Sequence, residues 1–198
     1  MKKLVKKFSL VLAVVLTTAG MYANTADFSL MVKKETGKTV RFALNTTEKT
    51  DLFIYDSEHA VVYSEKIEGK SNSDKMYNLD ALPNGTYFLE ADSAVRTVRY
   101  EITIDKSNAV VSEKPVVEVY KPTLVHQNGM VTLSILNFAE TPVHVTIYDA
   151  NGTEWYEGTF EGKVNFFKKF DLSQIPSDNY TFDITYNGRN FANTVVVK

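Results

Sequence analysis

The chain has 198 residues, of which 22 are basic and 24 acidic, and a formal net charge of −2 at neutral pH. It contains no cysteine, which excludes disulfides, thiol catalysis and cysteine-ligated metal sites. Its stability must come from buried apolar surface, and the length suffices for one large domain or two small ones.

Residues 1–23 have the features of a secretory signal peptide. Four lysines precede an apolar run at residues 8–16, and Ala23 follows among small residues as a possible cleavage site. The run is shorter than the about 20 apolar residues that span a bilayer, so we expect no transmembrane segment in the mature chain. The pattern predicts an exported protein, located in the extracellular space, on the cell surface or in the periplasm.

Removal of this segment also changes the charge of the chain. Four lysines and no acidic residues would be lost, which leaves 18 basic against 24 acidic residues and a net charge near −6. An acidic surface repels phosphate backbones and no basic cluster remains, so we expect no nucleic-acid partner.

The remaining chain repeats itself at an offset of 93 residues. Residues 52–104 align with 145–197 without a gap, and 13 of these 53 positions are identical. Apolar residues recur with period two in both copies, which is typical of strands with one buried face. Ile-Tyr-Asp stands at the same place in each copy, and a tyrosine follows seven residues after the aspartate, at Tyr63 and Tyr156. We expect both tyrosines to point into a core.

About seven short strands in each copy, separated by turn sequences, favour an all-β fold. We predict two tandem immunoglobulin-like antiparallel β-sandwich domains, at residues 27–105 and 115–198, joined by a polar linker at 106–114. Tyr87 and Tyr180 are expected to be buried, each with its hydroxyl bonded near the preceding turn as in a tyrosine corner.

Two strings resemble a known family: "YNLDALPNGTYFLEA" at 77–91 and "FDLSQIPSDNYTFDI" at 170–184, each preceded by Ile-Tyr-Asp. They are similar to the C-terminal sorting domains of type IX secretion cargo, which are small β-sandwich modules. The resemblance implies export, and partners among secretion-machinery or envelope proteins. This chain departs from the family because no proline-asparagine-proline sequence precedes Val131, and because two copies fill the whole predicted mature chain.

The usual signatures of catalysis are missing from the sequence. The three histidines, at positions 59, 126 and 144, are far apart in the chain, and no His-Glu-x-x-His motif occurs. There is no Gly-x-Ser-x-Gly sequence and no phosphate-binding glycine loop. We therefore expect no enzyme, no cofactor and no metal.

The remaining site hypothesis concerns aromatic residues on an outer sheet face. If Val145 and Ile147 face the core, then His144 and Tyr148 face outward, and the same alternation places Trp155 outward on the next strand. Exposed aromatics can stack on sugar rings or contact a partner protein, and they can also form cross-strand pairs or pack between domains. The binding residues predicted on this basis are Tyr148, Trp155, His144 and Asp183.

The function favoured by these patterns is that of a non-catalytic exported protein in adhesion, envelope scaffolding or secretion. The alternative is a carbohydrate-binding module that uses the exposed aromatics, with glycans as partners.

Overall fold

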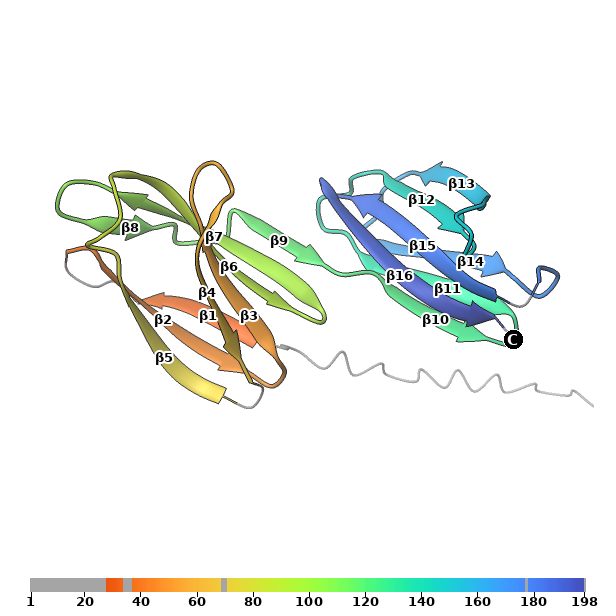
Figure 1. Cartoon of the computed structure of the whole chain (residues 1–198), viewed down its shortest axis with the longest axis horizontal. Helices are drawn as coiled ribbons and strands as arrows, with labels where there is room; N and C mark the ends of the chain where they lie inside the picture. Colours follow the sequence, from red (N-terminus) through yellow and green to blue (C-terminus); the bar gives the residue numbers. More distant parts are fainter. Residues whose placement is uncertain (1–27, 34–36, 69–70, 177, 198) are drawn as a thin grey trace, which may run out of the picture.

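The structure, a computed structural model of the chain, describes residues 28–33, 37–68, 71–176 and 178–197. Every secondary-structure element assigned among these residues is a β-strand. The strands form two sandwiches that lie side by side (Figure 1). Within this part of the chain, no helix is long and apolar enough to cross a membrane. The predicted signal peptide, residues 1–23, lies outside the described residues.

The first sandwich consists of two antiparallel sheets. One has the strand order β1-β2-β5 and the other the order β4-β3-β6-β7-β8. Burial alternates along the strands because one face of each sheet covers the core. The strands are β1 (Phe28–Lys33), β2 (Thr39–Thr46), β3 (Thr50–Tyr55), β4 (Val61–Ile67), β5 (Ser71–Asn78), β6 (Gly85–Ser93), β7 (Arg96–Ile104) and β8 (Ala109–Val111).

The second sandwich repeats this arrangement with the orders β10-β11-β14 and β13-β12-β15-β16. The structure confirms the prediction of two tandem immunoglobulin-like antiparallel sandwiches. The strands from the connection onward are β9 (Val117–Tyr120), β10 (Thr123–Gln127), β11 (Met130–Leu136), β12 (Val143–Tyr148), β13 (Glu154–Phe160), β14 (Asn165–Asp171), β15 (Asp178–Tyr186) and β16 (Arg189–Val197).

The internal repeat is preserved in the strand register. Ile54 pairs with Leu89 in the first domain and Ile147 pairs with Phe182 in the second, a shift of 93 residues in both strands. A β-bulge on β4, with Val62 as the extra residue, lies opposite Ile54 and Tyr55, and another on β13, with Trp155 as the extra residue, lies opposite Ile147 and Tyr148. The two copies therefore share strand order, pairing and irregularity.

Each domain buries its own apolar core. In the first domain the core includes Phe42, Leu44 and Leu89, and in the second it includes Tyr180 and Phe182. Since no cysteine is present, the burial of these side chains, each about 1.5–3 kcal/mol, is the main source of stability.

The predicted tyrosine corners are confirmed in both domains. The Tyr87 hydroxyl donates a hydrogen bond of 3.1 Å to the carbonyl oxygen of Pro83. The Tyr180 hydroxyl donates one of 3.0 Å to that of Pro176. Both tyrosines are buried, so each bond ties the loop before β6 or β15 to the core.

The expectation that Tyr63 and Tyr156 both enter a core is wrong for Tyr63. Tyr156 is partly buried and packs against the second core. Tyr63 is 40% exposed, and its hydroxyl donates to Glu65 at 3.2 Å. The reason is that β4 is an edge strand, so Tyr63 lies over the open side of the sandwich, where its ring meets that of Tyr77 with centroids 5.3 Å apart.

The connection between the domains is more structured than the predicted linker at 106–114. Strand β8 falls within this segment and pairs with β7. Strand β9, which the sequence placed in the second domain (115–198), also pairs with β7, from Arg96↔Tyr120 to Arg99↔Val117. Its Val119 side chain nevertheless packs in the second core. One short strand is therefore shared, with its backbone bonded to one domain and a side chain buried in the other.

We predict that Phe182→Ala lowers the free energy of unfolding by about 3–5 kcal/mol, since the ring is fully buried and its loss leaves a cavity. Phe167→Ala, on the outer side of β14 and 67% exposed, is the matched control and should change it by less than about 0.5 kcal/mol. Chemical denaturation measures both values. Equal losses in the two variants would contradict the strand phases described above.

Candidate functional site

The predicted site residues lie on the four-stranded sheet of the second domain. His144 and Tyr148 come from β12, Trp155 from β13 and Asp183 from β15, and these three strands are neighbours in the order β13-β12-β15. Asp183 is opposite Thr146 in the register, so it lies between the levels of His144 and Tyr148. The strand order thus brings the predicted residues to one sheet.

The polar members of this set already have partners on the sheet. The Nδ1 atom of His144 lies 2.8 Å from the Thr159 hydroxyl, and its Nε2 lies 3.3 Å from the Thr146 hydroxyl. The Asp183 carboxylate accepts a hydrogen bond of 2.5 Å from the Asn190 side chain. His144 and Asp183 are thus each bonded to neighbouring side chains of the sheet.

Trp155 does not share this outer face with Tyr148. The bulge after Ile147 makes Tyr148 pair with Glu154, so Trp155 is the extra residue of β13. An extra residue shifts the alternation of side chains by one position. The indole consequently meets the edge of Tyr180, a core residue, with ring centroids 5.9 Å apart.

The indole of Trp155 is held in place but not fully covered. Its Nε1 donates a hydrogen bond of 3.1 Å to Oδ2 of Asp149, whose Oδ1 accepts from the backbone N–H groups of Asn151 and Thr153 at 2.9 and 2.8 Å. The side chain remains 45% exposed. An aromatic ring that is held by one hydrogen bond and one ring contact, yet is open to solvent, can offer an apolar face to a ligand.

Trp155 borders a pocket of about 350 Å³ between the edges of the two sheets. Tyr156 lines it from β13, and Lys168, Lys169 and Asp171 line it from β14. Sequence patterns did not single out the two lysines, because a lysine on an edge strand is normally a solvated surface residue. The sequence does hold one signal that could have identified Lys168: at the repeat offset of 93 residues it is equivalent to Lys75, so the lysine is present in both copies.

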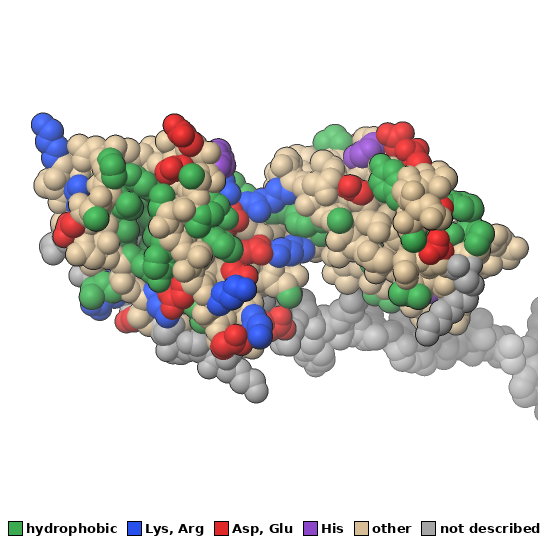
Figure 2. All heavy atoms as spheres, viewed as in Figure 1, with side chains coloured by type: hydrophobic (Ala, Val, Ile, Leu, Met, Phe, Trp, Pro, Cys, Tyr) green, Lys and Arg blue, Asp and Glu red, His purple; other side chains and the backbone are tan. Residues whose placement is uncertain are grey.

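A second concentration of charged groups lies where the two sandwiches meet (Figure 2). Glu90 of β6 is buried, and its Oε2 accepts from Arg99 at 2.7 Å and from Arg189 of the second domain at 2.8 Å. The Arg99 guanidinium also lies over the rings of Tyr55 and Phe88, at 5.4 and 5.6 Å from their centroids. Aromatic residues on the outer face of the first domain thus pack beneath an interdomain ion pair.

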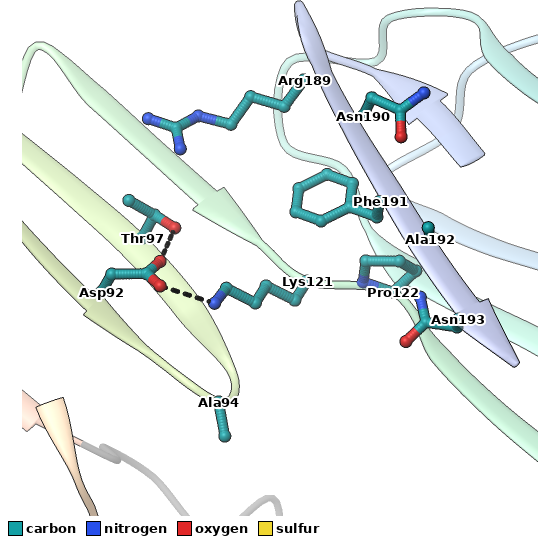
Figure 3. Close-up of a pocket in the computed structure, with 10 residues that line it drawn as sticks. All are labelled: Asp92, Ala94, Thr97, Lys121, Pro122, Arg189, Asn190, Phe191, Ala192 and Asn193. Atoms are coloured by element: carbon teal, nitrogen blue, oxygen red, sulfur yellow. Dashed lines mark hydrogen bonds and ion pairs between the residues drawn. The ribbon is translucent and has the colours of Figure 1, made fainter. Parts of the chain in front are cut away.

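A pocket of about 500 Å³ lies beside this ion pair and is lined by both domains (Figure 3). The Asp92 carboxylate is bonded to the Thr97 hydroxyl and to Lys121 Nζ, the latter at 2.9 Å. Arg189 extends from β16 toward the first domain above them. Since Asp92 and Lys121 neutralise each other, we interpret this pocket as part of the joint between the domains.

The joint is extended by contacts of β9. Arg96 forms an ion pair of 2.6 Å with Glu118, and the Tyr186 hydroxyl of β15 donates to the carbonyl oxygen of Tyr120. Burial raises the pKa of Tyr186, so its hydroxyl stays protonated and keeps this bond at physiological pH. Among the described residues, no group of three or more His, Cys, Asp or Glu side chains could hold a metal ion.

Comparison with known families concerns the first domain. The family described as "Secretion system C-terminal sorting domain" matches residues 36–105, about a third of the chain. The first domain is similar to secretion-system sorting domains. The resemblance inferred from the sequence motifs is thereby confirmed for this domain. No curated protein matches the chain.

Several solved structures have a low similarity to this chain. A segment of two fibronectin type III domains from chicken tenascin has a TM-score of 0.31 at 11% identity and covers 85% of this chain and 97% of its own. The FN1–FN3 domains of chicken CNTN1 have a TM-score of 0.31 at 7% identity, and the match covers 86% of this chain and 64% of that one. The BSP domain of a biofilm associated protein has a TM-score of 0.29 at 14% identity, and the match covers 84% of this chain and 29% of that one. Scores this low establish no shared function.

We predict a pH-dependent change at Trp155. The indole N–H, and after it the backbone N–H of Thr153, hold the pKa of Asp149 below its usual value of about 3.9. The bond between Asp149 and Trp155 should be complete above that value and be lost as the pH falls through the lower folded-state pKa. Trp155 is the only tryptophan, so its fluorescence should change with a midpoint below about 3.9.

Two variants control this titration. Asp149→Asn should abolish the transition, whereas Asp56→Asn, at the equivalent turn of the first domain, should leave it unchanged. Far-ultraviolet circular dichroism at each pH separates the local change from unfolding. A transition that persists in Asp149→Asn would contradict the assignment.

Proposed function

We propose that this chain is an exported, non-catalytic protein of the bacterial envelope or cell surface, where its two sandwiches serve adhesion, scaffolding or secretion. The observation that carries the proposal is the match of residues 36–105 to secretion-system sorting domains. A domain of that kind favours export, and the pattern of a signal peptide at residues 1–23 agrees with it.

The joint between the domains supports a structural role. Glu90 and Arg189 form a largely buried ion pair across it, and β9 is bonded to the first domain while Val119 packs in the second. Domains held by a shared strand and a buried pair keep a more constant orientation than domains on a free linker. Such a unit suits a spacer or scaffold whose partners are envelope or secretion-machinery proteins.

Cell fractionation of the natural host tests the proposal. We expect the full-length gene product to appear in the envelope or outside the cell, and its intact mass to show loss of about the first 23 residues. Protease added to intact cells distinguishes the two locations, since it reaches a protein on the surface and spares one in the periplasm. An unprocessed protein in the cytoplasm would refute the proposal.

Carbohydrate binding is the second candidate, and the exposed, positioned indole of Trp155 favours it. Because Trp155 lies on the pocket side of β13, the binding surface is centred on that pocket and not on the outer face with Tyr148, His144 and Asp183. A glycan array should show ligands whose binding is lost in Trp155→Ala and retained in Tyr148→Ala. An array without any Trp155-dependent signal would remove this candidate.

A further inference from the structure

The open side of the first sandwich contains a lysine paired with a carboxylate. Lys75 points inward from β5, and its Nζ lies 2.5 Å from Oε1 of Glu65 on β4. The hydroxyls of Tyr63 and Tyr77 both donate to Oε2 of the same carboxylate at 3.2 Å. The hydrogen bond from Lys75 lowers the pKa of Glu65. One ionised carboxylate therefore satisfies three donors at this position.

The second sandwich retains the lysine and lacks the carboxylate. At the offset of 93 residues, Lys75 corresponds to Lys168 and Glu65 corresponds to Gly158. The strand pairing confirms this correspondence, since Glu65 is opposite Leu52 on β3 and Gly158 is opposite Val145 on β12.

The tyrosine donors also differ between the two copies. Tyr77 is replaced by Phe170, which removes one hydroxyl, whereas Tyr63 is retained as Tyr156. A Cβ atom at Gly158 would lie 2.3 Å from the Tyr156 hydroxyl, so this side chain has moved over the glycine. The second domain thus keeps two of the three donors that surround Glu65 in the first.

These two donors have no acceptor among the residues that the structure describes. Lys168 Nζ lies 4.5 Å from the ring centroid of Phe160 and forms no ion pair with a described carboxylate, and the Tyr156 hydroxyl forms no hydrogen bond with a described residue. Both side chains line the pocket of about 350 Å³ beside Trp155. A lysine on a flexible stem without a carboxylate to hold it can turn its ammonium group toward a ligand.

We propose that this pocket binds the carboxylate of an acidic sugar, with Lys168 and Tyr156 in the roles that Lys75 and Tyr63 have toward Glu65. The sugar ring lies against the exposed indole of Trp155. The inference rests on the carbohydrate-binding candidate above and specifies its ligand class. The first domain contains the internal counterpart of the complex, because its own glutamate occupies the equivalent position.

The dimensions and charge of the pocket agree with a single acidic ring. A volume of about 350 Å³ is at the lower end of the range for small-molecule sites. Lys168 and Lys169 outnumber the one lining carboxylate, Asp171, which already accepts a bond of 2.9 Å from the backbone N–H of Ser173. Trp155 adds an apolar face, which a free carboxylate or a short acidic peptide would use less fully than a sugar ring.

The test titrates the full mature chain with a galacturonate trisaccharide, a galactose trisaccharide and a tripeptide with a central glutamate. Trp155 fluorescence and calorimetry report binding. We expect the galacturonate to bind with an affinity at least about tenfold higher than that of the neutral sugar, since a charge-assisted bond is lost in the latter. Lys168→Met should weaken galacturonate binding by at least about tenfold, and Lys163→Met, an exposed lysine outside the pocket, should not change it.

A second variant places the missing carboxylate in the pocket. Gly158→Glu recreates the residue of the first domain, and Tyr156 can move aside because Tyr63 coexists with Glu65 there. It should abolish galacturonate binding by pairing with Lys168. Galacturonate binding that is unchanged in Lys168→Met would overturn the proposal, even if Gly158→Glu does not fold.

The remaining outcomes separate this proposal from the broader one. Trp155-dependent binding of galactose and galacturonate with equal affinity would retain carbohydrate binding and reject the carboxylate site. Lys168-dependent binding of the tripeptide without binding of galacturonate would reject the sugar. An absence of binding by all three probes would reject the acidic-sugar site, while the glycan array decides the broader carbohydrate-binding candidate.

Discussion

Both domains depend on the pairing at the centre of the larger sheet, between β3 and β6 and between β12 and β15. This register places Leu52 and Ile54, and in the second copy Val145 and Ile147, in the core. A slip of one residue would turn every one of these side chains toward solvent. Because the chain has no disulfide to impose the pairing, the apolar pattern itself must specify it. That requirement explains why the pattern survived in both copies while other positions diverged.

The fold could be predicted from the sequence because it follows from this period-two pattern and from turn residues. The tyrosine corners at Tyr87 and Tyr180 were also predictable, since each follows its proline by four residues. The face of the sheet on which the Trp155 side chain lies could not be predicted. Trp155 is itself the extra residue of a bulge on β13, which reverses the alternation there, and a bulge leaves no mark in the apolar pattern of an edge strand. The bulge therefore explains why Trp155 lies on the pocket side of the sheet while Tyr148 lies on the outer face.

The joint between the domains could not be inferred from local sequence. Glu90 and Arg189 are 99 residues apart, and each resembles an ordinary surface charge. The sequence places β9 in the second domain, because nothing in its local pattern shows that its backbone pairs with β7 of the first. Comparison of the two copies was more informative than either copy alone. It shows that Glu65 has become Gly158 while Lys75 is retained as Lys168, a difference that a single domain would not reveal.

The shared strand β9 has a mechanical consequence. When the two ends of the molecule are pulled apart, the short ladder between Arg96–Arg99 and Val117–Tyr120 is one of the contacts that carry tension from one domain to the other. Opening this ladder frees residues 112–118, as far as Val119 in the second core, and these can extend to roughly 25 Å. The hydrogen bonds can form again when the tension falls, since both sandwiches remain folded. A chain anchored at a surface would thereby gain a reversible extension that absorbs strain without unfolding a domain.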